Sequence, residues 1–343
     1  MGLVIIGDIM LGRHQEQLIE EHGMEKILSG LKETIGKRKI VANLECPLFN
    51  ASSSNMKQCY SRLHAKEKYG RYLFENGFKV LSLANNHIFD FGLEGFLKTQ
   101  SILNENSIKY FGAGLNKLLS IKPAIIDVNN FTVGFLGFSF TNYSKKNTPG
   151  VAFLYDDTVE YAIKKVRDNV DFLIIMPHSG IELYQYPLKR DQKIYRMMIE
   201  LGADLIVGNQ SHCVQAMEIY LDKYIYYSIG DLLFDHFHED TRSDFSSDTS
   251  HPKKFSFNPD FKNIRYSLLL KIDIINGNLK VKHFPIMNKN GYNPVVLKSL
   301  DKKKWLSNFS ILSDKLKNSS RVEKERTRIE QELLFDLKNR GVI

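Results

Sequence analysis

The sequence predicts an α/β fold built in layers, with strands and helices alternating along most of the chain. Short runs rich in Val, Ile and Leu recur, and such runs are typical of interior strands that are buried on both faces. Between them lie segments that are apolar at spacings of three and four, as in helices that pack one face against a core. This alternation predicts sheets covered by helices in a layered sandwich.

The expected elements follow one another without an internal repeat. Strands are expected at Leu3–Ile6, Ile40–Leu44, Lys79–Ala84, Ala124–Val128, Val133–Phe138, Phe172–Met176, Leu205–Val207 and Tyr224–Ile229. Helices are expected at about Gln15–Leu31, Ala65–Glu75, Leu93–Asn106, Asp157–Asp168 and Leu188–Glu200.

The last part of the chain has a different pattern. Two alternating stretches, Ser267–Ile274 and Leu279–Phe284, flank Asn276-Gly277-Asn278, which predicts an antiparallel hairpin. The stretch Phe237–Asn258 has no periodicity and predicts a long exposed loop. After Lys298 the pattern is that of amphipathic helix alone. We therefore expect one domain over residues 1–297 and a C-terminal helical appendage over residues 298–343.

The composition excludes fibrous and wholly disordered classes, because 43% of the 343 residues are hydrophobic and 25% are charged. A net charge of +8 suits an anionic partner such as a phosphoester or an acidic polymer, but no motif supports nucleic acid. The three cysteines, Cys46, Cys59 and Cys213, have no CxxC spacing, so neither a zinc knuckle nor a disulfide framework is indicated. The sequence shows neither a secretory leader nor an apolar stretch of about 18 residues, so we expect a cytoplasmic protein without a transmembrane segment.

Polar residues with metal-binding chemistry follow five of the predicted strands. In open α/β sheets ligands bind beyond the carboxyl ends of the strands, so side chains from several strands can converge there. The five strand endings carry Asp8, Glu45, Asn85-Asn86-His87, His178 and Asn209-Gln210-Ser211-His212. Carboxylate, amide and imidazole ligands together suit Zn, Mn or Fe, and one or two such ions would activate water for hydrolysis.

Each of these residues also has a purely structural interpretation. Asp8 fits the cap of the following segment, and Glu45, two residues before Pro47, fits an exposed turn. The Asn-Asn-His string fits a hydrogen-bonded turn, although it is a poor strand former, and His178 and His212 fit ordinary loop positions. His236, His238 and His251 lie in the long predicted loop, where incidental exposure is the simpler explanation. No Walker A string and no GxSxG elbow is present, which argues against phosphate-loop and serine-nucleophile enzymes.

Taken in order, several strings resemble the capsule biosynthesis family of CapA or PGA-cap proteins, which function in poly-gamma-glutamate synthesis. They are GDIMLGR (Gly7–Arg13), NLECPL (Asn43–Leu48), SLANNHIFDFGLEG (Ser82–Gly95), FGAG (Phe111–Gly114), PHSGIELYQYP (Pro177–Pro187), GADLIVGNQSHCVQAMEIY (Gly202–Tyr220) and YYSIGDLLFD (Tyr226–Asp235). The resemblance covers about residues 3–285 and implies an α/β/β/α sandwich like that of calcineurin-like metallophosphoesterases.

The resemblance also implies roles for individual residues. Asp8 and His212 would bind one divalent ion, Asn86 and His178 a second, and Glu45 would bridge the two ions. His87 would be the general acid that protonates the leaving oxygen. The remaining site residues that it implies are Gln210 as a weaker ligand, and Arg13, Asn85, Glu182, Asp231 and Asp235 as residues that contact substrate or orient the ligands.

Two departures from the metallophosphoesterase pattern weaken the ligand set. The first motif of that fold is usually Asp-x-His, and Met10 stands here in place of the histidine, a change that the capsule family shares. The last motif is usually Gly-His-x-His, and Gln210 stands here in place of its first histidine. An amide oxygen binds such metals more weakly than imidazole does.

Three functions remain open at this stage. The first is a metal-dependent hydrolase or transferase that acts on a capsular or cell-surface polymer or its precursor, in contact with other capsule-synthesis proteins. The second is a non-catalytic assembly or export component that binds acidic polymer through its positive charge. The third is a nucleotide or nucleic-acid phosphodiesterase on the same fold.

Overall fold

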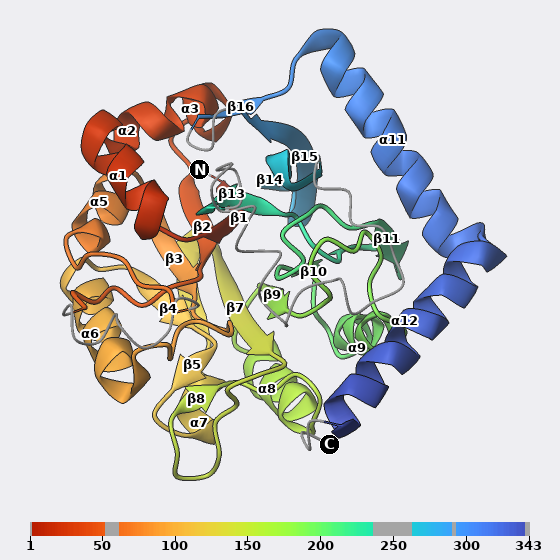
Figure 1. The fold of residues 1–343 in the computed structure, drawn as a ribbon, viewed down its shortest axis with the longest axis horizontal. Helices are drawn as coiled ribbons and strands as arrows, with labels where there is room; N and C mark the ends of the chain where they lie inside the picture. Colours follow the sequence, from red (N-terminus) through yellow and green to blue (C-terminus); the bar gives the residue numbers. More distant parts are fainter. Residues whose placement is uncertain (1, 52–61, 236–262, 290–292, 340–343) are drawn as a thin grey trace.

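Two sheets pack face to face, and helices cover the outer face of each sheet (Figure 1). The computed structural model describes residues 2–51, 62–235, 263–289 and 293–339. The predicted loop Phe237–Asn258 lies outside these ranges, as do Cys59, His236, His238 and His251.

Within the described ranges the first sheet has eight strands, and its centre is parallel. Its order is β16-β15-β14-β1-β2-β3-β4, with β13 also paired to β1. β1 through β4 and β13 run parallel to one another, whereas β14 is antiparallel to β1, β15 to β14 and β16 to β15. The strands are β1 (Leu3–Ile9), β2 (Lys39–Leu44), β3 (Phe78–Ser82), β4 (Lys109–Phe111), β13 (Asp231–Leu233), β14 (Tyr266–Ile275), β15 (Asn278–Asn288) and β16 (Pro294–Val296).

The second sheet has six strands in the order β11-β12-β10-β9-β7-β6. Its four central strands are parallel, and the two edge strands are antiparallel. The strands are β6 (Ala124–Val128), β7 (Phe131–Ser139), β9 (Phe172–His178), β10 (Leu205–Val207), β11 (Met217–Tyr220) and β12 (Lys223–Tyr226). A separate pair, β5 (Ala113–Gly114) and β8 (Gly150–Val151), lies outside both sheets.

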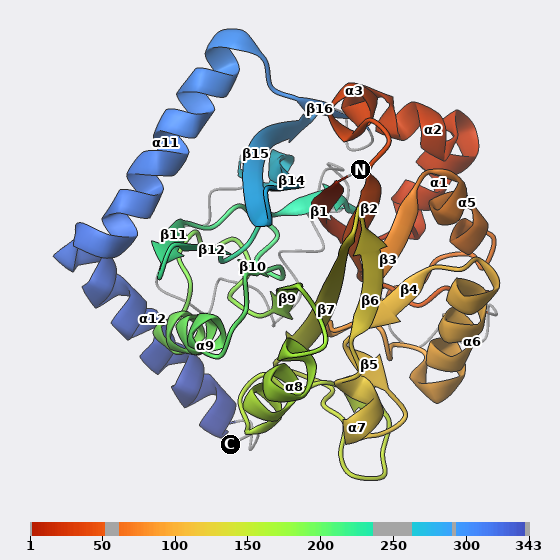
Figure 2. The ribbon, with the colours of Figure 1, turned by 180° about the vertical axis from the view of Figure 1, so that it is seen from behind.

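Helices form the outer layers, as Figure 2 shows from behind. The first sheet is covered by α1 (Arg13–His22), α2 (Met24–Ile27), α3 (Lys32–Ile35), α5 (Tyr69–Glu75) and α6 (Gly92–Glu105). The second is covered by α8 (Thr158–Arg167) and α9 (Lys189–Glu200), and the short α7 (Lys117–Ser120) lies beside β5 and β8. The chain closes with α11 (Ser299–Asn318) and α12 (Ser320–Asn339). No helix in the described ranges is both long enough and apolar enough to cross a bilayer.

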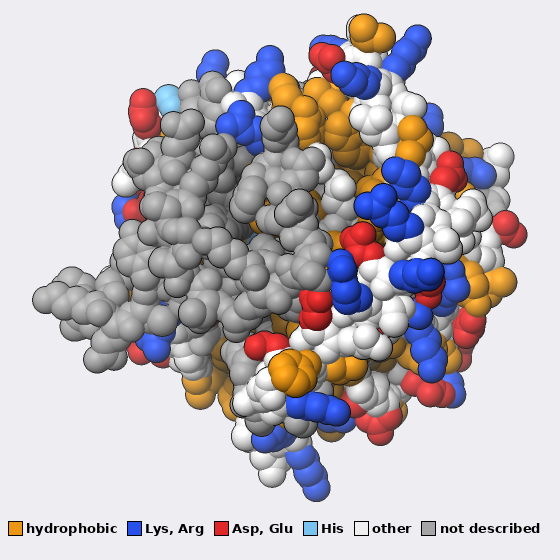
Figure 3. Space-filling view, turned by 45° about the vertical axis from the view of Figure 1, so that its right-hand side comes forward, with side chains coloured by type: hydrophobic (Ala, Val, Ile, Leu, Met, Phe, Trp, Pro, Cys, Tyr) orange, Lys and Arg blue, Asp and Glu red, His pale blue; other side chains and the backbone are white. Residues whose placement is uncertain are grey.

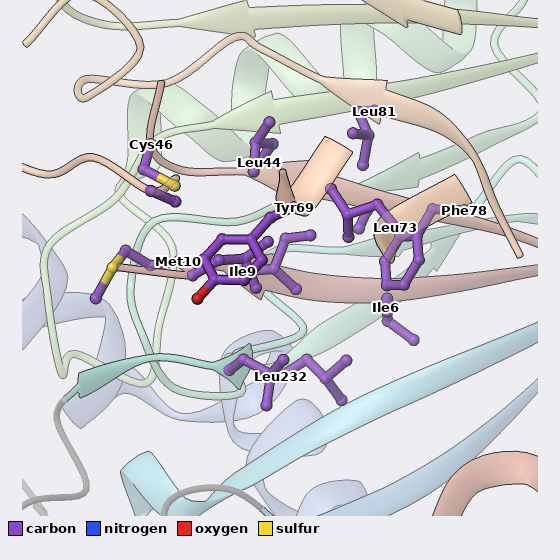
Figure 4. Close-up of a cluster of buried hydrophobic side chains, with 14 of the residues drawn as sticks. Ile6, Ile9, Met10, Leu44, Cys46, Tyr69, Leu73, Phe78, Leu81 and Leu232 are labelled. Carbon is purple, nitrogen blue, oxygen red and sulfur yellow. The ribbon is translucent and has the colours of Figure 1, made fainter. Parts of the chain in front are cut away.

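The alternation of side chains along β1 explains the two core layers on its faces. Val4 and Ile6 point toward the helices, whereas Leu3 and Ile5 point toward the second sheet. All four are almost fully buried. Figure 4 shows Ile6 in the helix-side layer, with Tyr69 and Leu73 of α5 packed nearby. A strand buried on both faces requires the continuous apolar run found in the sequence.

The predicted α/β sandwich with a C-terminal helical part is confirmed, and most differences concern element ends. β1 extends through Asp8, and β9 extends through His178, because both residues still pair in a sheet. The single helix expected from Gln15 is interrupted at Gly23, whose φ of 77° helical residues do not adopt. The late hairpin turns at Asn276 and Gly277, both with positive φ as a type I′ turn requires.

Candidate metal centre

The candidate ligands come from the carboxyl ends of strands in both sheets. Asp8 lies near the end of β1, and Glu45 directly follows β2. His178 is the last residue of β9 in the second sheet, and the turn that holds Gln210 and His212 follows β10. One ligand atom from each of Asp8, Glu45 and His212 lies within 4.8 Å of the other two. The predicted convergence of distant segments therefore holds for these three buried side chains.

The Asp8 carboxylate is fixed by donors from both sheets. Its Oδ1 accepts hydrogen bonds from Asn43 Nδ2 at 2.8 Å and from Asn209 Nδ2 at 2.5 Å. Its Oδ2 accepts from the backbone N–H of Gln210 at 3.2 Å. The carboxylate is thus oriented before any ligand arrives, which is the arrangement that metal sites need from their surroundings.

His178, Asn86 and Glu45 form a second group of potential donors beside the first. His178 Nε2 lies 2.9 Å from Asn86 Oδ1 and 3.6 Å from Glu45 Oε1. Its other ring nitrogen, Nδ1, lies 3.4 Å from Asn43 Nδ2. Burial, and next the nearby His212, lower the pKa of His178 well below its usual value, so this ring is neutral. Neutral imidazole is the form that binds metals.

His212 is paired with Asp231 through one of its two ring nitrogens. Its Nδ1 lies 3.0 Å from Asp231 Oδ1, and Asp231 pairs in register with Asp8 across β1 and β13. Burial is the largest influence and opposes a charged ring, but Asp231, Glu45 and Glu182 together outweigh it and raise the pKa of His212 well above its usual value. A carboxylate on one ring nitrogen orients the other toward a metal, as in many zinc and manganese proteins.

Buried negative charge is the dominant electrostatic feature of the site. Burial and the Asp231 carboxylate raise the pKa of Asp8 to about 6. Burial and the neighbouring Asp8 raise the pKa of Glu45 well above its usual value. Among the described residues, the buried Glu45 Oε1 and Gln210 Oε1 make no hydrogen bond. A divalent cation fits this site. It would offset the charge of carboxylates that repel one another, and it would be coordinated by the oxygens that have no hydrogen-bond donor.

Asn85 shapes the turn after β3 that presents Asn86 and His87. Its Nδ2 donates to Asn43 Oδ1 at 3.1 Å and to the Leu44 carbonyl at 2.8 Å. Its Oδ1 accepts from the backbone N–H groups of His87 at 3.1 Å and Ile88 at 2.9 Å. The amide oxygen therefore closes the turn, as the structural interpretation of the Asn-Asn-His string anticipated, and the amide nitrogen ties the turn to β2.

His87 lies beside the second donor group and has a carboxylate partner of its own. Its Nδ1 lies 2.8 Å from Asp90 Oδ2, which also accepts from the Leu63 backbone N–H at 2.6 Å. The His87 side chain is 22% exposed, so the ring borders both protein and solvent. The contact with Asp90 occupies Nδ1 of this ring and leaves Nε2 on its other side.

The other predicted site residues differ in their relation to this cluster. Glu182 is half-buried and close enough to raise the pKa of both Glu45 and His212, after larger contributions from burial and nearer carboxylates. Arg13 is exposed at the start of α1. Asp235 Oδ1 accepts from the backbone N–H of Gln15 at 3.2 Å and so ties the end of the β13 segment to the same helix.

Three contributing residues had no role assigned to them from the sequence. Asn43 contacts Asp8, Glu45 and His178, and Asn209 contacts Asp8. Asp90 holds His87. One signal was available for Asn43, because an Asn inside an apolar strand run is unfavourable unless its amide is hydrogen-bonded. Asn209 was named in the polar ending after Leu205–Val207 but without a role, and for Asp90 the sequence offers only its place inside the string Ser82–Gly95.

Two glycines allow the close backbone approach that the site needs. A Cβ on Gly7 would lie 1.6 Å from the Gly230 carbonyl oxygen, next to the pairing of Asp8 with Asp231. A Cβ on Gly208 would lie 2.0 Å from the Tyr227 carbonyl oxygen, just before the ligand turn. Both positions therefore require glycine for steric reasons.

A family model described as "Bacterial capsule synthesis protein PGA_cap" matches residues 2–236, which contain every candidate ligand. The chain belongs to this capsule synthesis family. It is 30% identical to the capsule biosynthesis protein CapA of Bacillus anthracis over 68% of this chain and 59% of that protein. It is 31% identical to the PGA biosynthesis protein CapA of Bacillus subtilis (strain 168) over 67% of this chain and 62% of that protein. The chain thus spans about three fifths of the length of these relatives.

Solved structures identify the fold of this capsule synthesis family member. A novel phosphatase from Mycoplasma pneumoniae matches with a TM-score of 0.50 and 12% identity, over 89% of this chain and 96% of that one. A hypothetical protein from Thermus thermophilus has the same TM-score and identity, over 84% of this chain and all of that one. The likeness shows the fold, which is the metallophosphoesterase sandwich that the sequence strings imply.

The methionine in the first motif has a clear structural place. Met10 is fully buried, and Figure 4 shows it in the hydrophobic layer near Cys46. Its sulfur accepts a hydrogen bond from the Gly12 backbone N–H at 3.2 Å. The position that carries a metal-binding histidine in related folds therefore belongs to the core here.

The close approach at Gly7 gives a first prediction. Gly7→Ala should destabilise the protein by about 1–3 kcal/mol or more, because the added methyl collides with a backbone carbonyl that cannot rotate away. Urea denaturation measures the effect. Gly134→Ala in β7 is the matched control, since its Cβ would meet a Val170 methyl at 3.0 Å, and it should cost less. Equal stability of the two variants would contradict the steric argument.

Proposed function

We propose that this capsule synthesis family member binds one or two divalent metal ions and is a hydrolase or transferase. Its substrate would be a phosphoester, amide or ester bond in a capsular or cell-surface polymer or its precursor. The observation that carries the proposal is the convergence of Asp8, Glu45 and His212 in a buried space, where burial raises the pKa of both carboxylates. The metal would be Mn, Zn or Fe, the ions that suit mixed oxygen and nitrogen ligands.

The ligands divide into two groups by position. Asp8 and His212 would hold one ion, with Glu45 shared. Asn86 Oδ1 and His178 Nε2, which lie 2.9 Å apart, would bind the second ion, with Gln210 as a further oxygen ligand. The second group has neutral ligands apart from Glu45. We therefore expect it to bind its ion more weakly than the first group does.

A divalent cation would supply Lewis acidity, making water a better nucleophile and offsetting charge on a phosphoryl or acyl oxygen. The chain's own acid is His87. Because Nδ1 donates a hydrogen bond to Asp90, Nε2 is the nitrogen that carries the transferable proton when the ring is charged. Asp90 orients the ring through Nδ1, and Nε2 would deliver its proton to the leaving oxygen.

A second candidate function is a non-catalytic component that binds acidic polymer. The burial of Met10 in the core supports it, because this removes a ligand that related folds possess. The net charge of +8 is compatible with it. Figure 3 shows Lys and Arg side chains on the face that α11 and α12 form, but acidic side chains are mixed among them. The mixed pattern favours the enzyme as the first proposal.

Metal binding gives a second prediction. Mn²⁺ at about 100 times its dissociation constant should raise the free energy of unfolding by about 2.7 kcal/mol, since only the folded chain brings the ligands together. Asp8→Asn and His178→Ala should abolish most of this increase, whereas His283→Ala, a half-buried histidine of β15, should keep it. Thermal unfolding with and without Mn²⁺ is the measurement. Full stabilisation of both ligand variants would contradict the assignment.

The role of His87 gives a third prediction. His87→Ala should lower the turnover of bis-p-nitrophenyl phosphate by about 10²-fold or more, with unchanged metal content, because the leaving group loses its proton donor. His64→Ala, which alters a histidine that contacts the Phe49 carbonyl instead, is the control. Unchanged turnover in His87→Ala would remove this residue from the mechanism. A metal-loaded chain without any turnover, with binding of anionic polymer, would favour the second candidate function.

A further inference from the structure

We propose that α12 positions the candidate metal ligands and that Arg326 is the positioning residue. The helix lies beyond residues 2–236, which the family model matches. The proposal rests on the metal binding proposed above and extends it to the C-terminal helical part. Figures 1 and 2 show α12 running beside α9, the helix that follows the loop after β9.

Arg326 is a buried cation that holds the end of this loop. Its side chain is 2% exposed, and its Nε donates to the Pro187 carbonyl at 2.9 Å. One terminal nitrogen, Nη2, donates to Gln192 Oε1 of α9 at 2.7 Å, and the other, Nη1, lies 3.2 Å from Glu323 Oε2. A buried guanidinium is costly unless its donors are paired, so these contacts work as a set and depend on one geometry.

Apolar contacts continue from Arg326 along the same loop. Ile329 is fully buried, and it packs in one cluster with Ile181, Tyr184 and Leu188. Further along α12, Glu330 Oε1 accepts a hydrogen bond from the Arg190 backbone N–H at 3.0 Å. The helix therefore covers the segment 181–190 through both apolar and polar contacts.

The segment under α12 is directly connected to the candidate ligands. It begins three residues after His178. The Leu183 backbone N–H donates to the carbonyl of Ser211, which stands between Gln210 and His212, at 2.8 Å. Gln215 Nε2 donates to the Tyr184 carbonyl at 2.9 Å and so joins the two segments again. A shift of the loop would therefore move both ligand-bearing segments.

The ligand turn needs such external support. Gln210 has a φ of 94° and His212 a φ of 51°, values that residues other than glycine seldom adopt. Conformations of this kind persist only where surrounding contacts enforce them. Leu183, with a φ of 60°, shares this property and supplies one of the contacts. The contacts between α12 and the loop are therefore needed to keep Gln210 and His212 in these backbone conformations.

The experiment compares Mn²⁺ affinity and stability in the full chain. Arg326→Met removes the donors while keeping much of the buried volume, and Arg321→Met makes the same change at an exposed position of α12. Isothermal titration with Mn²⁺ measures the dissociation constant, and thermal unfolding of the metal-free protein measures stability separately. Amide hydrogen exchange at Leu183 reports on the loop itself.

We expect Arg326→Met to weaken Mn²⁺ binding by about 10- to 100-fold, the usual effect of losing support behind metal ligands, and to speed exchange at Leu183. Arg321→Met should change neither quantity. A lower unfolding temperature with unchanged Mn²⁺ affinity would show that Arg326 is only structural and would overturn the proposal.

A second variant covers the case in which Arg326→Met does not fold. Glu330→Ala removes the contact to the Arg190 backbone N–H at a half-buried position and should weaken Mn²⁺ binding in the same direction. Unchanged affinity in this variant would then overturn the proposal. If the unaltered chain binds no Mn²⁺, the proposed function fails and this inference fails with it. If the unaltered chain binds Mn²⁺ and every variant binds it equally well, only the proposed role of α12 is contradicted.

Discussion

The burial of several carboxylates at one edge of two packed sheets is the constraint on which the rest of the site depends. Asp8 and Glu45 are fully buried, and Asp231 pairs with Asp8 across adjacent strands. Like charges in such a space repel strongly because little water screens them. Amides supplied by Asn43 and Asn209 and the imidazole of His212 offset part of this repulsion. A divalent cation is the group that would offset the remainder.

Much of the site was predictable because its residues follow a simple rule of parallel sheets. Strand runs buried on both faces are visible in the sequence, and their carboxyl ends meet at one edge. Asp8, Glu45 and His178 were found in this way, although Asp8 and His178 prove to lie inside their strands rather than after them. Strand ends are set by backbone pairing with neighbours, which the local sequence does not determine.

The contacts behind the ligands were less predictable, since they join distant segments. The roles of Asn209 and Asp90 depend on the residues that they contact in the folded chain, which are Asp8 and His87 respectively. Arg326 is one of many basic residues in a polar helix, yet it shares an apolar stripe with Val322 and Ile329 at helical spacing. A charged residue on such a stripe indicates a buried partner. The sequence does not say that this partner is a loop leading to His178.

The two sheets each contribute part of the proposed ligand set. Asp8, Glu45 and Asn86 lie in or shortly after strands of the first sheet, whereas His178, Gln210 and His212 lie in or shortly after strands of the second. The distances between donors consequently depend on how the sheets pack, through pairs such as Phe111 and Phe135, whose stacked rings lie 5.9 Å apart. Changes of side-chain volume in this interior layer would therefore alter the spacing of the candidate ligands while every candidate ligand stays the same.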